Sequence, residues 1–497
     1  MKERHILSKT TFMYGVQCKK RLYLHKNGKK FGIESDKVSA QQEAIFSTGT
    51  NVGELAQQLF PGGVDCTPES YYDFGPSLDL TEKSILDGVE VIYEAAFQHG
   101  QVLVALDILV KKSDGWHAYE VKSVNSTKPT HVQDAALQYY VITNSGLELK
   151  SINVLHFNKE YVRKGELDIS GLFTWDDVTE AVLELQPMIE EEIKANKAVL
   201  KESEIPDIKI GSHCGSPYAC DFIGTCWKNV PEYSVLNLTN PRGKNWELFD
   251  AGFVKFEDVP EDFPLSTAQR IQVEAEKTGE PIIDKEGIRD FVSRLNYPLY
   301  FMDFESIVPA VPIYDQTRPY QQVVFQYSVH IQKFENGPVE HKEFLADPSD
   351  KNLRVTVAEK LIEDMGTAGD VIVYNQSFEG PRLNEIGRDH PELNTKIQAI
   401  NNRIVDLAVP FNRKLYYTPE MRGRYSIKLV LPALVPDLSY KNLNIQDGGT
   451  ASLTFKHMVE GKFEGEAEQT RADLLEYCKL DTLAMVKILQ KLYTSQI

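Results

Sequence analysis

The spacing of apolar and polar positions divides the chain into predicted strands and helices. Residues 299–305 form a mostly apolar run that predicts a buried strand, and residues 370–375 predict a second one. A helix is expected to begin near Glu379, and apolar residues recur at helical spacing over residues 474–492. Strands and helices are therefore combined in this half of the chain, which predicts an α/β domain.

A second strand pattern lies nearer the N-terminus. Residues 101–111 and 116–123 each predict a strand. Ser113-Asp114-Gly115 between them is a turn signal, so the two strands are expected to pair as a hairpin. Further along, Gly252 follows the last apolar turn of one predicted helix, and residues 265–279 predict another. The pattern thus predicts a helical stretch between two strand-containing regions.

The length and composition of the chain agree with several globular domains. With 497 residues it exceeds one ordinary hydrophobic core, so two or three domains are expected. Hydrophobic residues make up 42% of the chain, and no apolar run approaches the roughly 18 residues that span a membrane. The segment Met1-Lys2-Glu3-Arg4-His5 is charged and precedes no long apolar segment, so we expect a cytoplasmic protein with no membrane partner.

The net charge limits the kind of nucleic-acid partner that the chain can have. A protein that coats DNA is usually basic, whereas this chain has a formal net charge of −18. The acidic balance predicts weak, salt-sensitive binding without sequence specificity. The sequence also lacks a Gly-x4-Gly-Lys-Ser/Thr loop, a His-Glu-x-x-His motif and a Gly-x-Ser-x-Gly motif. These absences exclude a P-loop motor, a zinc protease of that type and a serine hydrolase of that type.

Carboxylates of the C-terminal half are spaced so that they can converge. Asp303 and Glu305 alternate along the predicted strand and project to one face, where they repel unless a cation lies between them. Tyr477 and Asp481 are four residues apart, hence on one face of the predicted helix. Together with Glu379 at a helix start, these acids could hold two divalent cations, the chemistry of nucleic-acid hydrolysis. Any one patch alone is better explained as ordinary solvated acids.

This set resembles the motifs of the DEDD exonucleases, proofreading-type enzymes on an RNase H-like (DnaQ-type) fold. Its Tyr-x-x-x-Asp spacing matches their tyrosine subclass. The resemblance implies that Asp303 bridges two Mg²⁺ or Mn²⁺ ions, and that Glu305 and Asp481 hold the ion that activates water. It also implies that Glu379 serves the second ion and that Tyr477 orients the attacking water.

One position departs from that pattern. The second-motif residue of the family is usually Asp, whereas this chain has Glu379, whose longer side chain changes how far its ligand oxygens reach. Asp406, in the apolar stretch 404–407, is either a reserve ligand or a plain strand-end acid. The resemblance covers roughly residues 296–497.

The predicted hairpin of the N-terminal half carries a second group of charged residues. Successive side chains of a strand point to opposite faces, so Glu120 and Lys122 lie on one face. The hairpin could bring Asp107 beside them. Two carboxylates can hold Mg²⁺, and a lysine can stabilise charge that develops on a phosphate. Glu-x-Lys alone is common as an exposed ion pair, but here a helix containing Gln138-Tyr139-Tyr140 follows it.

This arrangement resembles the PD-(D/E)XK nucleases of the RecB type, on a restriction-endonuclease-like fold. The resemblance implies that Asp107 and Glu120 bind one or two metal ions and that Lys122 assists the attacking water. RecB-type nucleases often carry an upstream histidine ligand, which the segment 49–54 lacks. Glu54 either replaces that ligand or is a helix-surface acid. We place this domain at residues 1–235.

Three of the six cysteines are clustered, with spacing Cys-x5-Cys-x5-Cys, and Cys18 is a candidate fourth ligand. In a cytosolic chain such a cluster indicates a metal rather than disulfides, and thiolates suit zinc or iron–sulfur. The chain has one cysteine before the nuclease core and three after it, an arrangement that resembles that of the RecB-like nucleases with a 4Fe–4S cluster. The resemblance implies a structural 4Fe–4S cluster. A four-cysteine zinc site is the alternative. Cys66 and Cys478 are expected to be ordinary buried or half-buried residues. His213 is either a further ligand or, as we expect, a residue beside the site or on the surface. The proposed ligands are Cys18, Cys214, Cys220 and Cys226.

Two further segments have alternative interpretations. Residues 236–295 predict a helical connector, either a helix-hairpin-helix-like module that touches DNA or a plain spacer. Residues 412–417 and 422–428 interleave cations with aromatic residues, as grooves for single strands do, although an exposed loop with packed tyrosines would have the same pattern.

Together these features resemble a bacterial family that fuses an iron–sulfur RecB-like nuclease to a DEDD exonuclease. The expected function is metal-dependent hydrolysis of nucleic acid, with DNA, in particular single-stranded DNA, expected rather than RNA. The C-terminal domain would act as a 3′–5′ exonuclease beside an N-terminal nuclease. The alternative is a non-catalytic nucleic-acid-binding or assembly protein built on degenerate nuclease folds.

Overall fold

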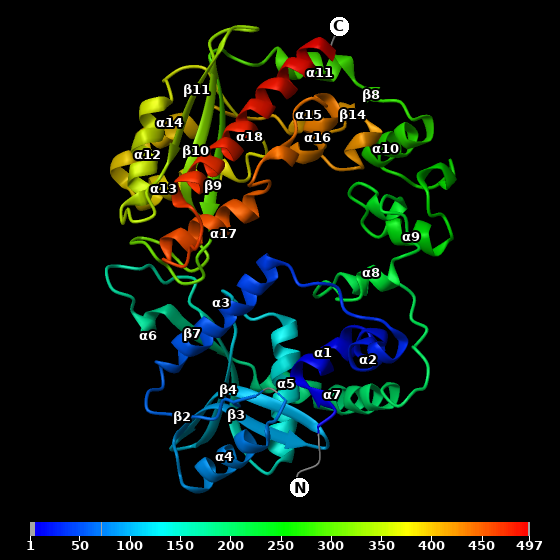
Figure 1. Ribbon diagram of the computed structural model, residues 1–497, viewed down its shortest axis with the longest axis vertical. Coiled ribbons are helices and arrows are strands. Elements are labelled where there is room, and N and C mark those ends of the chain that lie inside the picture. The colour runs from blue at the N-terminus through cyan, green and yellow to red at the C-terminus, as the bar shows by residue number, and fades with distance from the viewer. Residues whose placement is uncertain (1–4, 71, 496–497) are drawn as a thin grey trace. The chain divides into compact units, whose positions relative to one another are not determined.

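The computed structural model describes residues 5–70 and 72–495. Residues 1–4, which carry most of the charged N-terminal segment, and residues 71 and 496–497 lie outside the described part. Contacts within the chain define two compact units: unit 1 comprises residues 1–229 and 310–320, and unit 2 comprises residues 230–309 and 321–497 (Figure 1). Both units combine helices with a mixed sheet, which confirms the predicted α/β class.

Unit 1 is built on a sheet that has seven strands within the described residues, in the order β2-β3-β4-β5-β6-β7, with β1 alongside β4. Pairing is parallel for β1–β4, β2–β3 and β5–β6 and antiparallel for the other neighbours. The strands are β1 (Leu7–Ser8), β2 (Val64–Asp65), β3 (Val91–His99), β4 (Val102–Lys112), β5 (Gly115–Val121), β6 (Leu149–Phe157) and β7 (Phe173–Asp177). The predicted hairpin is β4–β5. It closes where Lys112 pairs with Gly115, whose φ of +135° favours glycine.

Helices cover both faces of this sheet. Side chains of α1, α5 and α7 share one hydrophobic cluster with Val104 and Val154, whereas side chains of α3 share another with Ile108 and Leu155. Val154 and Leu155 are neighbours on β6 and enter different clusters because successive side chains of a strand point to opposite faces. The helices are α1 (Lys9–Gln17), α2 (Lys19–Asn27), α3 (Ala40–Gln57), α4 (Gly75–Leu86), α5 (Pro129–Asn144), α6 (Ile169–Leu172), α7 (Thr179–Val199) and α8 (Ile223–Cys226), with 3-10 turns η1 (Gly28–Phe31) and η2 (Ser212–Cys214).

A distant segment, residues 310–320, also belongs to unit 1. Ala310 is buried in the cluster that contains Phe157. The segment also exchanges backbone hydrogen bonds with Arg163, whose N–H donates to the carbonyl of Thr317 (3.0 Å) and whose carbonyl accepts from Gln316 (2.9 Å). The chain therefore passes between the units three times. The predicted domains, with boundaries at 235 and 296, follow one another along the chain and do not include this return to unit 1.

Unit 2 has a five-stranded sheet in the order β11-β10-β9-β12-β13 within the described residues. Strand β10 is antiparallel to both β9 and β11, whereas β12 is parallel to β9 and β13 is parallel to β12. The strands are β8 (Ile282–Ile283), β9 (Leu299–Ile307), β10 (Val323–Gln332), β11 (Val339–Leu345), β12 (Asp370–Val373), β13 (Ile404–Asp406) and β14 (Tyr416–Tyr417), of which β8 and β14 form a separate pair. The predicted strands at 299–305 and 370–375 are β9 and β12.

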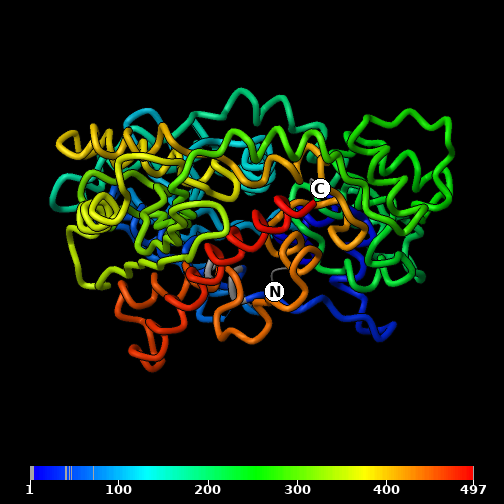
Figure 2. The backbone as a smooth tube through the Cα atoms, turned by 90° about the horizontal axis from the view of Figure 1, so that it is seen from above, coloured from blue at the N-terminus to red at the C-terminus, as the bar shows by residue number. Residues whose placement is uncertain are grey.

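The long helix α18 packs on this sheet, against β9, β10 and β11 (Figure 1). It contains the predicted helix 474–492, and Figure 2 traces it as one continuous helix at the C-terminal end of the chain. The other helices of unit 2 are α9 (Lys244–Asp250), α10 (Thr267–Thr278), α11 (Lys285–Val292), α12 (Leu353–Asp364), α13 (Glu379–Asp389), α14 (Pro391–Asn401), α15 (Val409–Asn412), α16 (Ile427–Leu434), α17 (Gly448–Val459) and α18 (Ala467–Ser495), with 3-10 turns η3 (Val235–Asn237), η4 (Phe256–Asp258), η5 (Pro419–Met421) and η6 (Tyr440–Asn442).

The stretch expected as a connector, residues 236–295, falls within unit 2. Helix α10 begins with a capping box in which Ser266 and Gln269 bond each other's backbone, and it ends at Gly279 in a left-handed conformation. Side chains of this stretch form a small core of their own around Leu248 and Phe256. Among the described helices, none combines the length and the apolar character needed to cross a membrane.

Candidate metal centres

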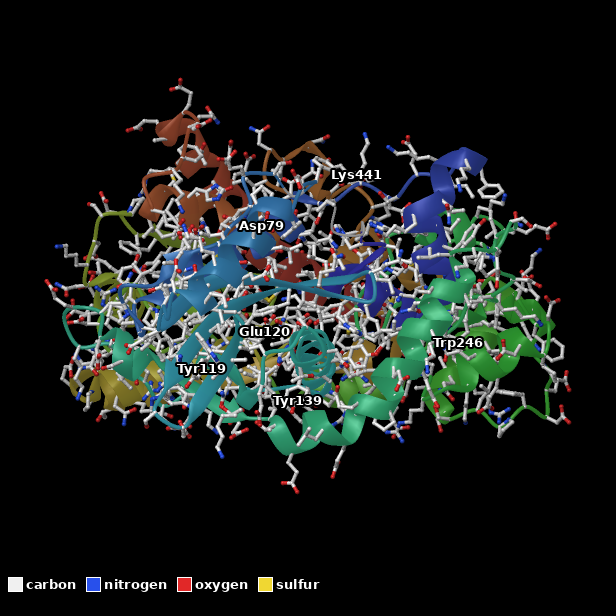
Figure 3. The ribbon with its side chains drawn as sticks, turned by 90° about the horizontal axis from the view of Figure 1, so that it is seen from below. Asp79, Tyr119, Glu120, Tyr139, Trp246 and Lys441 are labelled. Carbon is white, nitrogen blue, oxygen red and sulfur yellow. The ribbon has the colours of Figure 1, made fainter. Side chains whose placement is uncertain are left out.

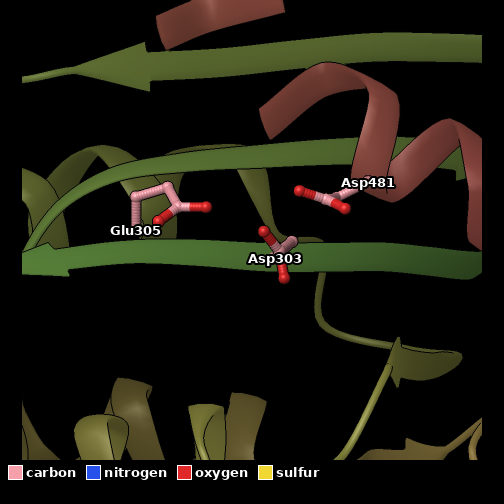
Figure 4. Close-up of side chains that lie close together, drawn as sticks. All are labelled: Asp303, Glu305 and Asp481. Carbon is pink, nitrogen blue, oxygen red and sulfur yellow. The ribbon is translucent and has the colours of Figure 1, made fainter. Parts of the chain in front are cut away.

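Three acids from distant parts of unit 2 meet at one point. Asp303 and Glu305 lie on β9 and Asp481 on α18 (Figure 4). One carboxylate oxygen from each lies within 4.8 Å of the others. Glu305 and Asp481 are only 7% and 6% exposed. Buried carboxylates at this separation repel one another, so the arrangement is suited to a cation.

The electrostatics of this acidic triad show the cost of that repulsion. Burial, followed by the charges of Asp481 and Glu305, raises the pKa of Asp303 well above its ordinary value. Burial is also the main reason that the pKa of Glu305 rises to about 8 and that of Asp481 to about 6. A divalent cation between the carboxylates would favour their ionised forms. The triad is therefore a candidate site for Mg²⁺ or Mn²⁺, which prefer oxygen ligands.

Glu379 lies near the triad but outside the group of three. It is the first residue of α13 and is 1% exposed, and its charge raises the pKa values of Asp303 and Glu305. Its Oε2 has no hydrogen-bond partner among the described residues. Burial raises the pKa of Glu379 itself to about 8. A buried carboxylate oxygen without a hydrogen-bond partner is costly, which is consistent with a role for Glu379 as a cation ligand.

Asp406 is hydrogen-bonded to the backbone of the loop that precedes α13 and to that of Ala408. Its Oδ1 accepts hydrogen bonds from the backbone N–H of Asn375 (2.9 Å) and Ala408 (2.8 Å), and its Oδ2 accepts from Gln376 (3.2 Å). Asn375 has a φ of +76°, so this turn is held in a conformation that an ordinary residue resists. Asp406 therefore fixes the loop that leads into α13 and thereby positions Glu379.

Two tyrosines and a lysine surround Asp481. Tyr477 is buried, and its pKa is raised by burial and then by the charge of Asp481. Tyr440 donates a hydrogen bond of 2.6 Å to Oδ1 of Asp481. The Nζ of Lys428 lies 5.5 Å from the ring centroid of Tyr440 and 5.3 Å from that of Tyr477. Tyr440 had no local signal in the sequence, because its partner lies 41 residues away.

The hairpin of unit 1 brings together the three residues expected there. The backbone N–H of Val121 donates to Oδ2 of Asp107 at 2.5 Å, which ties β4 to the end of β5. Glu120 is 1% exposed, and the Nζ of Lys122 donates to its Oε1 at 2.7 Å. Nε2 of Gln138 on α5 donates to Oε2 of Glu120 at 2.7 Å. Figure 3 labels Glu120 and Tyr139, the residue that follows Gln138. Asp107, Glu120 and Lys122 thus share one buried polar cluster.

This cluster contains three charged residues that the sequence did not suggest. Lys9, the first residue of α1, donates from Nζ to Oε1 of Glu120 at 2.6 Å. Lys122 also donates to Oδ2 of Asp134 on α5, a second carboxylate whose Oδ1 has no hydrogen-bond partner among the described residues. Glu94 on β3 is the third, because its charge raises the pKa of Asp107.

Glu94 and Asp107 face each other where β3 and β4 lose regular pairing. Pairing runs from Tyr93–Ile108 to Ala95–Leu106 and omits the two acids between. Glu94 has a φ of +50°, a strained value for a residue with a side chain. Burial raises the pKa of both acids. By contrast, Glu54, the expected substitute ligand, is exposed on α3, and Glu94 is the acid that the structure places beside Asp107.

The four clustered cysteines line one pocket. Cys18 is the residue that ends α1, and it lines this pocket with the three downstream cysteines and with the basic residues Lys20, Arg21 and Lys209. His213 also lines it, with Nε2 3.8 Å from Sγ of Cys214. The pocket is therefore a candidate site for a metal–thiolate centre, although among the described residues no three of its Cys and His ligand atoms lie within 4.8 Å of one another. The cysteines of the pocket are Cys18, Cys214, Cys220 and Cys226.

The other two cysteines are buried apart from this pocket. Cys66 is 1% exposed, and Cys478 is fully buried with its Sγ 3.7 Å from Oδ2 of Asp303. Burial raises the pKa of both thiols, which favours their protonated forms.

The interpretation of residues 412–417 as part of a groove for single-stranded nucleic acid is wrong for three of its residues. Lys414, Tyr416 and Tyr417 are buried, and Tyr417 donates to Glu276 of α10 at 2.8 Å. These side chains join the loop to the stretch around α10. Arg422 and Arg424 are exposed, and Arg422 forms an ion pair with Glu232 at 2.6 Å.

Comparison with known proteins finds similarity in part of the chain. A family model described as a domain of unknown function, DUF2779, matches residues 300–426. The uncharacterized protein UU173 of Ureaplasma parvum is 30% identical over 223 residues, which cover 40% of this chain and 32% of that protein. The uncharacterized protein MG366 homolog of Mycoplasma pneumoniae is 28% identical over 229 residues, 41% of this chain and 34% of the relative. The chain thus matches about a third of the length of each relative.

Proposed function

We propose that this chain is a metal-dependent nuclease with two catalytic modules and a cysteine-bound metal centre. The observation that carries the proposal is the convergence of Asp303, Glu305 and Asp481, whose oxygens lie within 4.8 Å of one another. The three acids come from a strand and a helix that are far apart in the sequence. Burial of three carboxylates together destabilises the metal-free protein. Selection for stability alone therefore does not account for their convergence.

Unit 2 is proposed to be an RNase H-like exonuclease of the DEDD type that trims a 3′ end, with single-stranded DNA as substrate. Bound Mg²⁺ or Mn²⁺ ions would supply the activation of water and the neutralisation of phosphate charge. The triad and Glu379 would hold them. Tyr477 would orient the attacking water.

Lys428 and Tyr440 would set the charge of this site. The ammonium of Lys428 lowers the pKa of Glu305 and of Asp481, and the hydrogen bond from Tyr440 lowers that of Asp481 further. Both groups therefore favour the ionised carboxylates that a divalent cation requires.

Unit 1 is proposed to be a PD-(D/E)XK nuclease of the RecB type. Asp107 and Glu120 would hold a metal ion, and Lys122 would stabilise charge that develops on the attacked phosphate. Gln138 holds the second oxygen of Glu120 and so orients the first one. Glu94, which lies beside Asp107, would complete the ligand set.

The cysteine pocket of unit 1 is proposed to hold a structural 4Fe–4S cluster, with zinc as the alternative. Four thiolates carry four negative charges, and the neighbouring basic side chains of Lys20 and Arg21 would offset part of them. Because the ligands come from both ends of the unit, a bound centre would tie residues 18 and 214–226 together.

Digestion of end-labelled oligonucleotides tests the nuclease proposal. Single-stranded DNA and RNA are incubated with Mg²⁺ or Mn²⁺ and the parent, Asp303→Ala, Asp481→Ala, Asp107→Ala or Lys122→Ala proteins. The first two substitutions are expected to remove 3′-end trimming and the last two the remaining cleavage. Glu476→Ala, an exposed acid on α18, is the control that should leave digestion unchanged. Digestion by the Asp303→Ala and Asp481→Ala proteins at the parent rate would reject the assignment of unit 2, and binding without any digestion would favour a non-catalytic protein.

A further inference from the structure

Two lysines converge on a single carboxylate oxygen in unit 1. Oε1 of Glu120 accepts from Nζ of Lys9 at 2.6 Å and from Nζ of Lys122 at 2.7 Å. Lys122 lies two residues from Glu120, so its position follows from the strand. Lys9 lies 111 residues away and reaches the same oxygen through the fold.

The backbone holds Lys9 in this place. Ser8 and Leu7 form β1, which pairs with Leu103 and Val102 of β4, the strand that carries Asp107. Ser8 is also the N-cap of α1, and its side chain and that of Thr11 bond each other's backbone in a capping box. Lys9 therefore follows a short strand anchored to the strand of the proposed metal ligand.

The two lysines are held differently. Lys122 contacts two carboxylates, Glu120 and Asp134. Lys9 has its close contact with Glu120, whereas Oδ2 of Asp134 is 4.0 Å from its Nζ. Its side chain is also 28% exposed, compared with 1% for Glu120. A cation that binds Glu120 would thus deprive Lys9 of its main partner while leaving Lys122 attached to Asp134.

We propose, on the basis of the nuclease function of unit 1, that Lys9 is a second active-site lysine that leaves Glu120 when metal binds and contacts a phosphate of the nucleic acid. Lysine suits this role because it carries a compact charge with three donors on a flexible stem. In the metal-free protein Lys9 neutralises Glu120, and in the loaded site it faces the substrate. Its partial exposure gives the substrate access to it.

Binding of an oligonucleotide under non-cleaving conditions tests this role directly. The full chain carries Asp303→Ala to silence unit 2, and a single-stranded DNA oligonucleotide is titrated in Ca²⁺ at several salt concentrations. Loss of one phosphate contact lowers the slope of log K against log salt by about 0.7 for a single strand. Lys9→Met is expected to show this loss. Lys19→Met is the control, since Lys19 is 27% exposed and paired with Glu192 outside the cluster.

Metal binding and cleavage supply two further readouts in the same background. Mn²⁺ titrated without nucleic acid should bind Lys9→Met as tightly as the parent or more tightly, because the ammonium no longer competes for Glu120. Cleavage by Lys9→Met should fall by about a hundredfold, with partial recovery in Lys9→Arg. The melting temperature of each variant confirms that it is folded.

The outcomes separate this proposal from the function on which it rests. An unchanged salt slope in Lys9→Met would overturn the role of Lys9. Mn²⁺ binding that is tenfold weaker in Lys9→Met would also overturn it, because Lys9 would then serve only to position Glu120. Absence of cleavage by the silenced parent would instead reject the nuclease assignment of unit 1, and the salt slope would still decide whether Lys9 contacts phosphate.

Discussion

The hydroxyl of Tyr440 donates a hydrogen bond of 2.6 Å to Oδ1 of Asp481, in the buried centre of unit 2. The bond joins the turn η6 to α18 and holds one carboxylate of the triad in a single orientation. A hydrogen bond to the ionised form of an acid lowers its pKa, and this bond opposes the effect of burial on Asp481.

Replacement of Tyr440 by phenylalanine is expected to weaken metal binding. The pKa of Asp481 should rise above about 6, and metal affinity should fall by about 10–100-fold, as for other partners of metal ligands. Calorimetric titration with Mn²⁺ at pH 6, 7 and 8 measures both effects, and the loss should be largest at pH 6. Tyr425→Phe, which changes an exposed tyrosine, is the control; equal affinity of the Tyr440→Phe and parent proteins at pH 6 would contradict the prediction.

The metal-free protein is expected to lose stability as the pH rises. Burial, followed by the charge of Asp481, raises the pKa of Glu305 from its ordinary 4.5 to about 8. The unfolded chain therefore releases this proton at lower pH than the folded chain, so the stabilising effect is complete below about pH 4.5 and is lost as the pH approaches 8. Melting temperatures in EDTA should fall by several degrees between pH 5 and pH 8.

Glu305→Gln isolates the contribution of this carboxyl group. The variant should melt close to the parent at pH 5 and above it at pH 8, because the amide does not ionise. Mn²⁺ should raise the melting temperature of the parent at pH 8 more than that of the variant. A parent and variant with parallel pH profiles would show that Glu305 is ionised in the metal-free fold.

Substitution of a pocket cysteine should remove the bound metal of unit 1. Cys18→Ser is expected to lower the iron content of anaerobically purified protein and, with it, the melting temperature. Cys66→Ser, which alters a buried cysteine outside the pocket, should keep the iron. Elemental analysis and visible absorbance measure the outcome: zinc in place of iron would select the alternative centre, and absence of both metals from the parent would reject a metal site.

Residues 310–320 should be required for the stability of unit 1. The hydroxyls of Tyr320 and Ser123 lie 2.6 Å apart, and Tyr320 also bonds the carbonyl of Ser123. Tyr320→Phe is expected to lower the free energy of unfolding by about 1–3 kcal/mol, the cost of leaving buried partners unsatisfied. Tyr218→Phe, at an exposed tyrosine, should change it by less than about 0.5 kcal/mol. Denaturant unfolding measures both.

A fragment of residues 1–229 gives a stronger form of the same test. It lacks Ala310, which is buried against the cluster around Phe157, and so exposes apolar surface. We expect the fragment to melt at a lower temperature than the full chain or to aggregate. A fragment as stable as the full chain would show that the segment contributes nothing.

Part of the site could be predicted because it depends on local geometry. Asp303 and Glu305 share a face of β9 because a strand has period two, and the turn at Gly115 determines which residues of β4 and β5 pair. The position of Glu54 relative to Asp107 could not be predicted, since their separation in the sequence carries no geometric information. No local pattern indicates Glu94, because the irregularity between β3 and β4 that places it opposite Asp107 arises from strand pairing.

The amino-acid sequence by itself determined the strands, the helices and the residues that share a face within each of them. These follow from backbone periodicity and turn chemistry, which act over a few residues. Only the tertiary structure decided that Asp481 meets Asp303, that Tyr440 bonds Asp481, and that Lys9 reaches Glu120. Such contacts join elements that lie far apart in the chain, and they depend on how helices pack against the sheets, which no local pattern encodes.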